Sequence, residues 1–213
     1  MTTTDGLSHT PADPAKRDFI LILTGAMAAG GAAAALWPLV AEMDPTSDVI
    51  AKGSPITVDI SKVEPGQQIT VLWQSKPIFI VNRTPAALRR LTDPSVLDRL
   101  RDPNSKSRQQ PVYAQNWSRS IKPEYLVLIG ICTHLGCIPN YRPSPGSVDP
   151  QWPGGWFCPC HGSRYDLAGR VFKSVPAPLN MPVPPYDYAN DTQIVLGKNP
   201  SGGQFAMSDI DTM

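Results

Sequence analysis

The feature that most constrains the fold of this chain is a pair of short segments rich in cysteine and histidine. They read CTHLGC at residues 132–137 and CPCHGS at residues 158–163, and together they contain all four cysteines and two of the three histidines. Cysteine and histidine at such close spacing are typical of metal ligands. We therefore expect the fold to bring the two segments together around one metal centre.

The spacing of these residues says more about the metal than their types do. Two cysteines and two histidines first suggest zinc. A zinc finger pairs cysteine with cysteine and histidine with histidine, whereas each segment here supplies one of each, as Cys132-x-His134 and Cys158-x-x-His161. A 2Fe-2S cluster with one iron on two thiolates and the other on two imidazoles fits this pattern. The spacing favours the cluster, and a zinc site without a redox role is the alternative.

Cys137 and Cys160 are left without a metal if Cys132 and Cys158 bind iron. Four cysteines permit three pairings, and under this assignment only a disulfide between Cys137 and Cys160 remains. It would link the two segments. Such a disulfide persists only in an oxidising compartment, so we expect this part of the chain to lie outside the cytoplasm.

An uncharged stretch from Phe19 to Ala41 lies near the N-terminus. A helix of these 23 residues would span roughly 34 Å, enough to cross the hydrocarbon core of a bilayer. A cleaved secretory signal is the alternative, but its apolar part is usually only about 7 to 15 residues long, and the cleavage site after Ala41 is poor. We predict an uncleaved transmembrane anchor over residues 18–41.

Lys16 and Arg17 precede this stretch and predict its orientation. Positive residues near a span stay on the cytoplasmic side, so residues 1–17 would be a cytoplasmic tail and the rest of the chain would lie in the periplasm. This agrees with the oxidising compartment expected above. The run Lys16-Arg17-Asp18-Phe19 also looks like a twin-arginine export signal whose first arginine is lysine.

Most of the chain after residue 55 has the pattern of a small all-β domain. Proline is abundant, with 24 residues against roughly 5% of an average protein, and it favours turns over long helices. Short runs of β-branched and aromatic residues separated by turns predict an antiparallel β-sandwich or barrel. The predicted strands cover residues 56–60, 68–73, 77–82, 125–131, 155–158 and 192–196.

Composition also divides the chain into regions. Residues 42–54 are polar and contain turn formers, which predicts a flexible hinge, centred on Asp44 to Lys52, between anchor and head. We expect the head over residues 55–200, with its cluster-binding part over about 125–180, and a C-terminal tail over residues 201–213.

Residues between Pro85 and Pro111 interrupt the strand pattern. Apolar residues recur at helical spacing from Ala86 to Leu100, which predicts a short helical insertion broken at Pro94. Nothing else in the sequence explains this insertion, and we expect a passive surface elaboration rather than a partner contact.

These motifs resemble the Rieske iron-sulfur subunit of the bacterial cytochrome bc complex. The resemblance covers nearly the whole chain, from the export-like N-terminus, anchor and linker to both cysteine-histidine segments and the loop Pro176-Ala177-Pro178. It implies one Rieske-type 2Fe-2S cluster. By the same resemblance, the buried iron would bind Cys132 and Cys158, and the exposed iron would bind His134 and His161.

The resemblance further implies how an electron would arrive. His161, with His134 beside it, would accept a hydrogen bond from a ubiquinol hydroxyl and take up a proton together with the electron. The hydroxyls of Ser163 and Tyr165 would bond to a bridging sulfide and to a cysteine sulfur. These bonds would stabilise the reduced cluster and raise its potential.

Partners follow from the same resemblance. Leu135, Gly136 and the loop Pro176-Ala177-Pro178 would form an apolar tip that docks on the cytochrome b subunit, and Val175 replaces the glycine usual in this loop, so we expect a different local backbone there. The electron would pass to a c-type cytochrome. The chain would thus be a subunit of a quinol–cytochrome c reductase, in a dimeric respiratory or photosynthetic complex.

The small subunit of arsenite oxidase is the alternative on the same fold, since it also carries a Rieske cluster, a disulfide and an export signal. The uncleaved anchor, the linker and Ser163 with Tyr165 favour the quinol interpretation. Rieske ferredoxins and ring-hydroxylating oxygenases typically lack Cys137, Cys160 and the anchor. The formal net charge of +1 gives no reason to expect a nucleic-acid partner.

Overall fold

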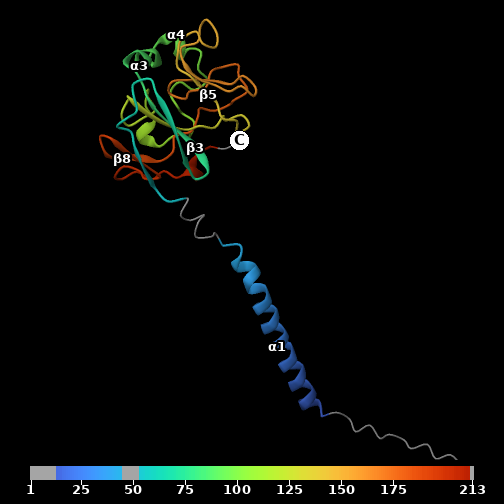
Figure 1. Cartoon of the computed structure of the whole chain (residues 1–213). Coiled ribbons are helices and arrows are strands. Elements are labelled where there is room, and N and C mark those ends of the chain that lie inside the picture. Colours follow the sequence, from blue (N-terminus) through green and yellow to red (C-terminus); the bar gives the residue numbers. More distant parts are fainter. Residues whose placement is uncertain (1–12, 45–52, 212–213) are drawn as a thin grey trace, which may run out of the picture. The chain divides into compact units, whose positions relative to one another are not determined.

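A computed structural model describes residues 13–44 and 53–211 of the chain. The chain divides into an N-terminal unit and a larger head, with the boundary between Ile50 and Ala51 (Figure 1). The hinge predicted over Asp44 to Lys52 and the tail predicted over residues 1–17 lie mostly outside the described residues.

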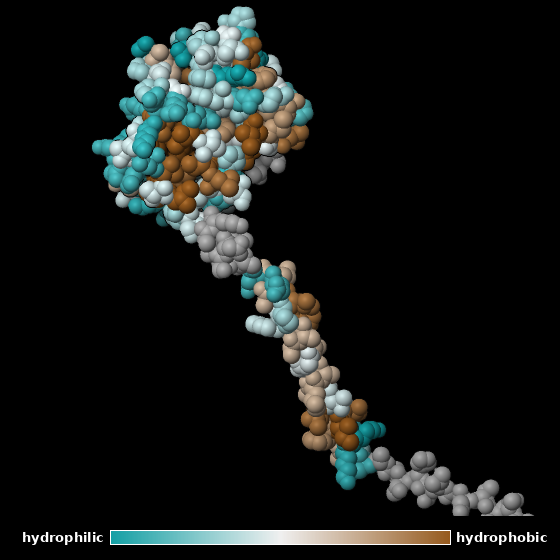
Figure 2. Space-filling model, in the orientation of Figure 1, coloured by the Kyte–Doolittle hydropathy of each residue, from teal (hydrophilic) through white to brown (hydrophobic). Residues whose placement is uncertain are grey.

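The N-terminal unit contains one long helix, α1 (Pro14–Ala41). The Asp13 carboxylate caps the helix by accepting a hydrogen bond from Ala15 N at 3.0 Å, and Pro14 needs no partner at the first helical position. Apolar residues cover the middle of α1 and hydrophilic residues its two ends (Figure 2). The helix is long and apolar enough to cross a membrane, which agrees with the predicted anchor.

The described part of the head contains three antiparallel sheets of three strands each. The first has the order β1-β9-β8, with β1 (Ile56–Asp59), β9 (Gln193–Leu196) and β8 (Tyr186–Asn190). The second has the order β2-β3-β4, with β2 (Gln68–Trp73), β3 (Lys76–Asn82) and β4 (Tyr125–Ile129). The third has the order β5-β6-β7, with β5 (Asn140–Arg142), β6 (Gly155–Phe157) and β7 (Arg164–Asp166).

The second sheet lies at the centre of the core. Gln74 and Ser75 join β2 to β3 in a two-residue turn, and both adopt left-handed φ angles of 49° and 58°, which match the twist of the strands. Trp73 pairs with Lys76 across this turn. Residues 78–81 of β3 are buried on both faces, so the sheet is covered on each side by other parts of the head.

The all-β class is confirmed, and each predicted strand segment overlaps a strand of the structure, whereas β5, β7 and β8 were not predicted. β5 and β7 are only three residues long, too short for an alternating pattern to be recognised. β8 follows the proline-rich residues 182–185, which have the composition of a loop.

The insertion between β3 and β4 packs against residues 167–172, which follow β7. The insertion contains two helices, α3 (Pro85–Leu91) and α4 (Pro94–Leu97). Two 3-10 turns are described in the rest of the head, η1 (Val112–Ala114) and η2 (Met207–Asp209). The helical pattern breaks before Pro94, as predicted. The insertion is built into the packing of the head, because Leu91 and Leu100 are buried and Leu100 forms a β-bridge with Phe172. The prediction that it makes no partner contact stays a prediction.

Candidate metal centre

Both cysteine-histidine segments are loops of the third sheet. The first joins β4 to β5, and the second joins β6 to β7. β5 follows the first loop, and β6 and β7 flank the second. Because β6 pairs with both β5 and β7, these strands are neighbours in one sheet. Strand pairing thus brings together segments that are 20 residues apart in the sequence.

The two loops have the same internal hydrogen bonds. In each, the N–H of the first residue donates to the carbonyl of the sixth, at 2.7 and 2.8 Å, and the N–H of the fifth donates to the carbonyl of the first, at 3.0 and 2.9 Å. The fifth residue is Gly136 in one loop and Gly162 in the other, with left-handed φ angles of 82° and 77°. Residues with a Cβ rarely adopt this conformation, which explains the two glycines.

The four predicted ligands converge from these loops. Cys132 and Cys158 are buried and carry free thiols. The rings of His134 and His161 lie 4.8 Å apart between their centroids. Nδ1 of His134 is buried and has no hydrogen-bond partner among the described residues. His161 is exposed, so one histidine of the pair is open to a partner molecule.

This donor set fits a 2Fe-2S cluster. Burial raises the pKa of the Cys158 thiol, and the neighbouring Cys132 raises it further, so neither effect favours a thiolate. A metal cation reverses this preference, because a coordinating thiol is deprotonated. The buried His134 Nδ1 likewise calls for a partner. Two thiols and two imidazoles are the ligands that the irons of a Rieske-type cluster require.

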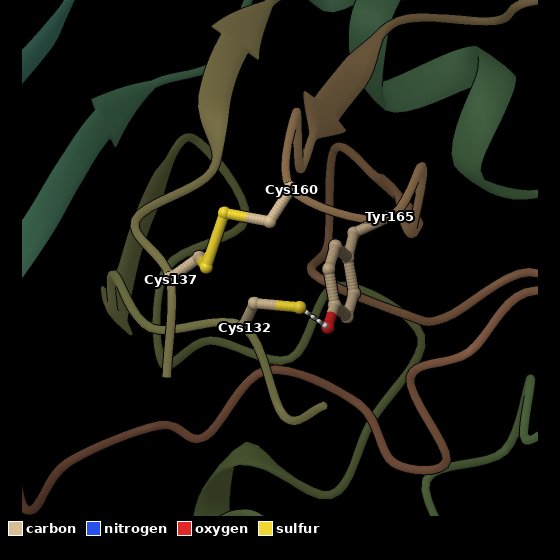
Figure 3. Close-up of a disulfide and its surroundings, with 4 residues drawn as sticks. All are labelled: Cys132, Cys137, Cys160 and Tyr165. Carbon is tan, nitrogen blue, oxygen red and sulfur yellow. Dashed lines mark hydrogen bonds between the residues drawn. A yellow bond between two sulfur atoms is a disulfide. The ribbon is translucent and has the colours of Figure 1, made fainter. Parts of the chain in front are cut away.

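A disulfide between Cys137 and Cys160 joins the two loops, as predicted (Figure 3). The Cys158 sulfur lies within 4.8 Å of both sulfur atoms of this disulfide. Because the disulfide sulfurs are bonded to each other, only Cys158 in this group of three can act as a thiolate ligand. The disulfide therefore braces the loops, and the ligand role falls to the remaining cysteines.

Tyr165 is buried, and its hydroxyl donates a hydrogen bond to Cys132 Sγ at 3.2 Å (Figure 3). The same oxygen accepts a hydrogen bond from Thr133 N at 3.1 Å. Burial raises the pKa of Tyr165 well above its ordinary value, so the hydroxyl keeps its hydrogen. The sequence predicted Tyr165 but missed Thr133, whose hydroxyl also donates to Leu179 O at 2.7 Å. A threonine between two ligands carries no sequence signal for such contacts.

A third loop, residues 174–180, contacts Ser163 through its backbone. Ser163 is buried, and its Oγ accepts a hydrogen bond from Ala177 N at 3.0 Å. The Ala177 side chain is also buried, which differs from the surface position expected for it, whereas Pro176 is exposed. The left-handed residue of this loop is Ser174, with a φ of 55°, so Val175 does not need the conformational freedom of a glycine.

Apolar side chains are exposed on the first loop. Leu135 is 71% exposed and Ile138 is 58% exposed, and Gly136 lies between them on the surface. Exposed apolar groups that gather beside a reactive residue are typical of a contact surface. The sequence predicted Leu135 and Gly136 as docking residues, and Ile138, which it did not single out, is exposed beside them.

Comparisons with known proteins agree with this geometry. Residues 103–186 match the family described as "Rieske [2Fe-2S] domain", and residues 7–46 match "Ubiquitinol-cytochrome C reductase Fe-S subunit TAT signal". A ubiquinol-cytochrome c reductase iron-sulfur subunit from Allochromatium vinosum is 50% identical over 188 residues, 86% of this chain and 89% of that protein. This chain belongs to the ubiquinol-cytochrome c reductase iron-sulfur subunits.

Another iron-sulfur subunit, from Bradyrhizobium diazoefficiens, is 44% identical over 197 residues, 92% of this chain and 100% of that protein. A solved structure described as "Hyperthermophilic respiratory Complex III" is 25% identical and covers 82% of this chain and 98% of that chain, with a TM-score of 0.45.

Membership of this family decides several predictions. The Rieske-type 2Fe-2S cluster is confirmed over zinc, and the oxidoreductase of the cytochrome bc complex is favoured over an arsenite oxidase. As an iron-sulfur subunit of that complex, the chain has cytochrome partners. The match over residues 7–46 includes Lys16 and Arg17, in agreement with the predicted export-signal-like region.

Proposed function

We propose that this iron-sulfur subunit takes one electron and one proton from ubiquinol and passes the electron to a c-type cytochrome. The observation that carries this proposal is the convergence of two buried thiols and two imidazoles on loops joined by a disulfide. When bound, the cluster supplies a one-electron carrier whose histidine ligands give it a high potential. Quinol oxidation of this kind contributes to a respiratory or photosynthetic proton-motive force.

Cys132 and Cys158 would hold the buried iron of the cluster, and His134 and His161 would hold the exposed one. The burial of both thiols and the exposure of His161 support this division. The matched backbone of the two loops supports it too, because each loop then supplies one cysteine and one histidine from the same framework.

His161 is the proposed point of contact with ubiquinol, because its ring is exposed while His134 is half-buried. The ring nitrogen of His161 that faces away from the metal can accept a hydrogen bond from the quinol hydroxyl and then keep its proton. His134 packs against this ring at an interplanar angle of 88°, which restricts its rotation and orients it.

Ser163 and Tyr165 adjust the affinity of the site for the electron. Tyr165 donates a hydrogen bond to Cys132 Sγ. The Ser163 oxygen accepts a hydrogen bond from Ala177 N, so its own hydrogen is left for another acceptor, which would be a sulfide of the cluster when it is bound. Hydrogen bonds donated to sulfur stabilise the more negative, reduced form and raise the potential.

The surface that docks on the cytochrome b subunit is proposed to include Leu135, Gly136, Pro176 and Pro178. Leu135, Gly136 and Pro176 are exposed, and Pro178 is partly exposed. Burying such apolar surface favours association. Ala177 supports this surface from below, through its buried backbone and side chain, rather than contacting the partner.

We further propose that α1 is a single-pass anchor in the bacterial inner membrane, with a cytoplasmic N-terminus and a periplasmic head, in a dimeric complex. Lys16 and Arg17 before the apolar stretch support this orientation, and so does the disulfide, which needs an oxidising compartment. The proposed regions are an N-terminal tail (1–17), an anchor (18–41), a hinge (42–54), a Rieske domain (55–200) whose cluster-binding part covers about 125–180, and a C-terminal tail (201–213).

Low-temperature electron spin resonance of the reduced protein tests the ligand set. We expect the signal of a mixed His/Cys 2Fe-2S cluster in the wild type, and its loss in Cys132→Ser and His161→Ala variants. His9→Ala is the matched control, because this third histidine is remote in sequence from both loops. A signal that survives in His161→Ala, or a midpoint potential that does not vary with pH, would contradict the proposal.

A further inference from the structure

The third loop, residues 174–180, contacts both cluster loops although it contains no strand or helix. Ala177 N donates to Ser163 Oγ at 3.0 Å on the second loop. Leu179 O accepts from Thr133 Oγ1 at 2.7 Å on the first. Without regular secondary structure, this loop needs other contacts to hold these two hydrogen bonds in place.

The side chain of Asn180 supplies such contacts at the end of the loop. Asn180 is 1% exposed, and its Oδ1 accepts a hydrogen bond from Val171 N at 2.9 Å. Its Nδ2 donates to Asp102 O at 3.0 Å and lies 3.4 Å from Ser105 Oγ. One buried amide thus ties the third loop both to the segment after β7 and to the insertion between β3 and β4.

The insertion is a rigid partner for this amide. The Asp102 carboxylate accepts hydrogen bonds from Lys106 N at 2.9 Å and Ser107 N at 3.0 Å. Ser105 is fully buried with a left-handed φ of 51°, and its carbonyl accepts from Gln110 Nε2 at 2.8 Å. A non-glycine residue persists in this conformation only where its surroundings hold it firmly.

The other end of the loop is held by the same insertion. The Arg101 guanidinium donates to Val175 O at 3.3 Å. Next to it, Arg101 N donates to Val171 O at 2.9 Å and Lys173 N donates to Arg99 O at 2.8 Å, on either side of the antiparallel β-bridge between Leu100 and Phe172. The third loop is therefore attached to the insertion on both sides of Ala177.

We propose that Asn180 is a positioning residue for the redox centre, which holds the third loop on the insertion so that Ala177 N stays on Ser163 Oγ. A serine hydroxyl has one hydrogen, and an N–H that donates to its oxygen leaves this hydrogen available to another acceptor, which the proposed function of Ser163 takes to be the cluster. Asn180 thus acts through Ser163, and this inference rests on the proposed function of Ser163. It also gives the insertion a role in electron transfer.

The test is an Asn180→Ala variant in the full-length protein within its membrane complex. We expect a lower midpoint potential, together with hydrogen exchange of the Ala177 amide that is about tenfold faster, the size of effect expected from losing about one hydrogen bond. The matched control is Asn82→Ala in β3, whose Nδ2 donates to Val63 O at 2.7 Å, away from the third loop. The control is expected to lose stability without a change in potential.

A second pair of variants keeps the outcome decisive. In a Ser163→Ala background, Asn180→Ala is expected to cause no further fall in potential, because Asn180 acts through Ser163. If Asn180→Ala does not fold, Arg101→Gln replaces it, since Arg101 is exposed and holds the same loop. An unchanged potential in both Asn180→Ala and Arg101→Gln, an equal fall in Asn82→Ala, or additive falls with Ser163→Ala overturns the inference. An unchanged potential in Ser163→Ala alone instead contradicts the proposed function of Ser163.

Discussion

Replacing Tyr165 by phenylalanine isolates one hydrogen bond to a proposed cluster ligand. The change removes the hydroxyl that donates to Cys132 Sγ at 3.2 Å and accepts from Thr133 N at 3.1 Å. The ring is fully buried, so phenylalanine keeps its packing. Two effects are expected to follow, one on the midpoint potential and one on stability.

The effect on the potential can be estimated from the charge of the acceptor. Reduction adds one negative charge to the site, and a hydrogen bond to a charged acceptor is worth about 1 kcal/mol more than one to a neutral acceptor. For a one-electron couple, 59 mV corresponds to about 1.4 kcal/mol, so losing the Tyr165 hydroxyl is expected to lower the potential by ~40 mV. The Thr133 N–H also loses its partner, at a cost of ~1 to 3 kcal/mol in the free energy of unfolding.

Redox titration of the electron spin resonance signal measures the first effect, and thermal unfolding measures the second. Tyr141→Phe is the matched control, because its hydroxyl donates to Gly66 O at 3.1 Å rather than to a ligand. The control is expected to lose stability and keep its potential. An unchanged potential in Tyr165→Phe, or the same fall in Tyr141→Phe, would refute the assignment of Tyr165 to the cluster.

Three further predictions concern the stability of the head. Cys160→Ser removes the disulfide, whose cysteines are 23 residues apart, and is expected to lower the free energy of unfolding by ~3 kcal/mol. Reduction of the wild type is expected to have the same effect. A melting temperature of the variant equal to that of the oxidised wild type would contradict this. Gly155 has a φ of 151°, and Gly155→Ala places a Cβ against the carbonyl oxygen of Tyr165, so calorimetry should show a fall of more than ~3 kcal/mol in the free energy of unfolding. The control Gly146→Ala, whose Cβ would lie in open space, should cost only about 1 to 2 kcal/mol. Burial raises the pKa of Tyr141 from 10.0 to about 12, so folding favours its neutral form. The stability from this group is complete below pH 10 and falls as the pH rises from 10 to 12, and Tyr141→Phe should reduce this fall.

The chemistry of the site could be predicted because it depends on residues close together in the sequence. Cys132 with His134, and Cys158 with His161, carry their meaning in their spacing, and the two cysteines left over indicate the disulfide. The apolar stretch of α1 could be recognised for the same reason, since hydropathy is a property of consecutive residues. Strands long enough to show a pattern, such as β2 and β3, were also found.

Tertiary structure alone decided which distant residues support the site. Ala177 was expected on the surface, yet it is buried because its amide turns toward Ser163. Asn180 reaches Asp102, 78 residues away, through a contact that leaves no local pattern. A side chain's hydrogen-bond partner depends on where the chain folds back, and no short stretch of sequence contains that information.

The sequence by itself thus determined the 2Fe-2S cluster, the disulfide, the long apolar helix and most of the strands, and the individual ligands it predicts remain a proposal. The structure decided how these parts support one another, including the packing of the insertion against residues 167–172 through Leu91 and Leu100. It also decided the partners of the buried Arg170 guanidinium, which forms an ion pair with Asp166 and donates a hydrogen bond to Leu91 O at 2.7 Å. Ligand chemistry is local and can be recognised from spacing, whereas the burial and pairing of polar groups are consequences of the whole fold.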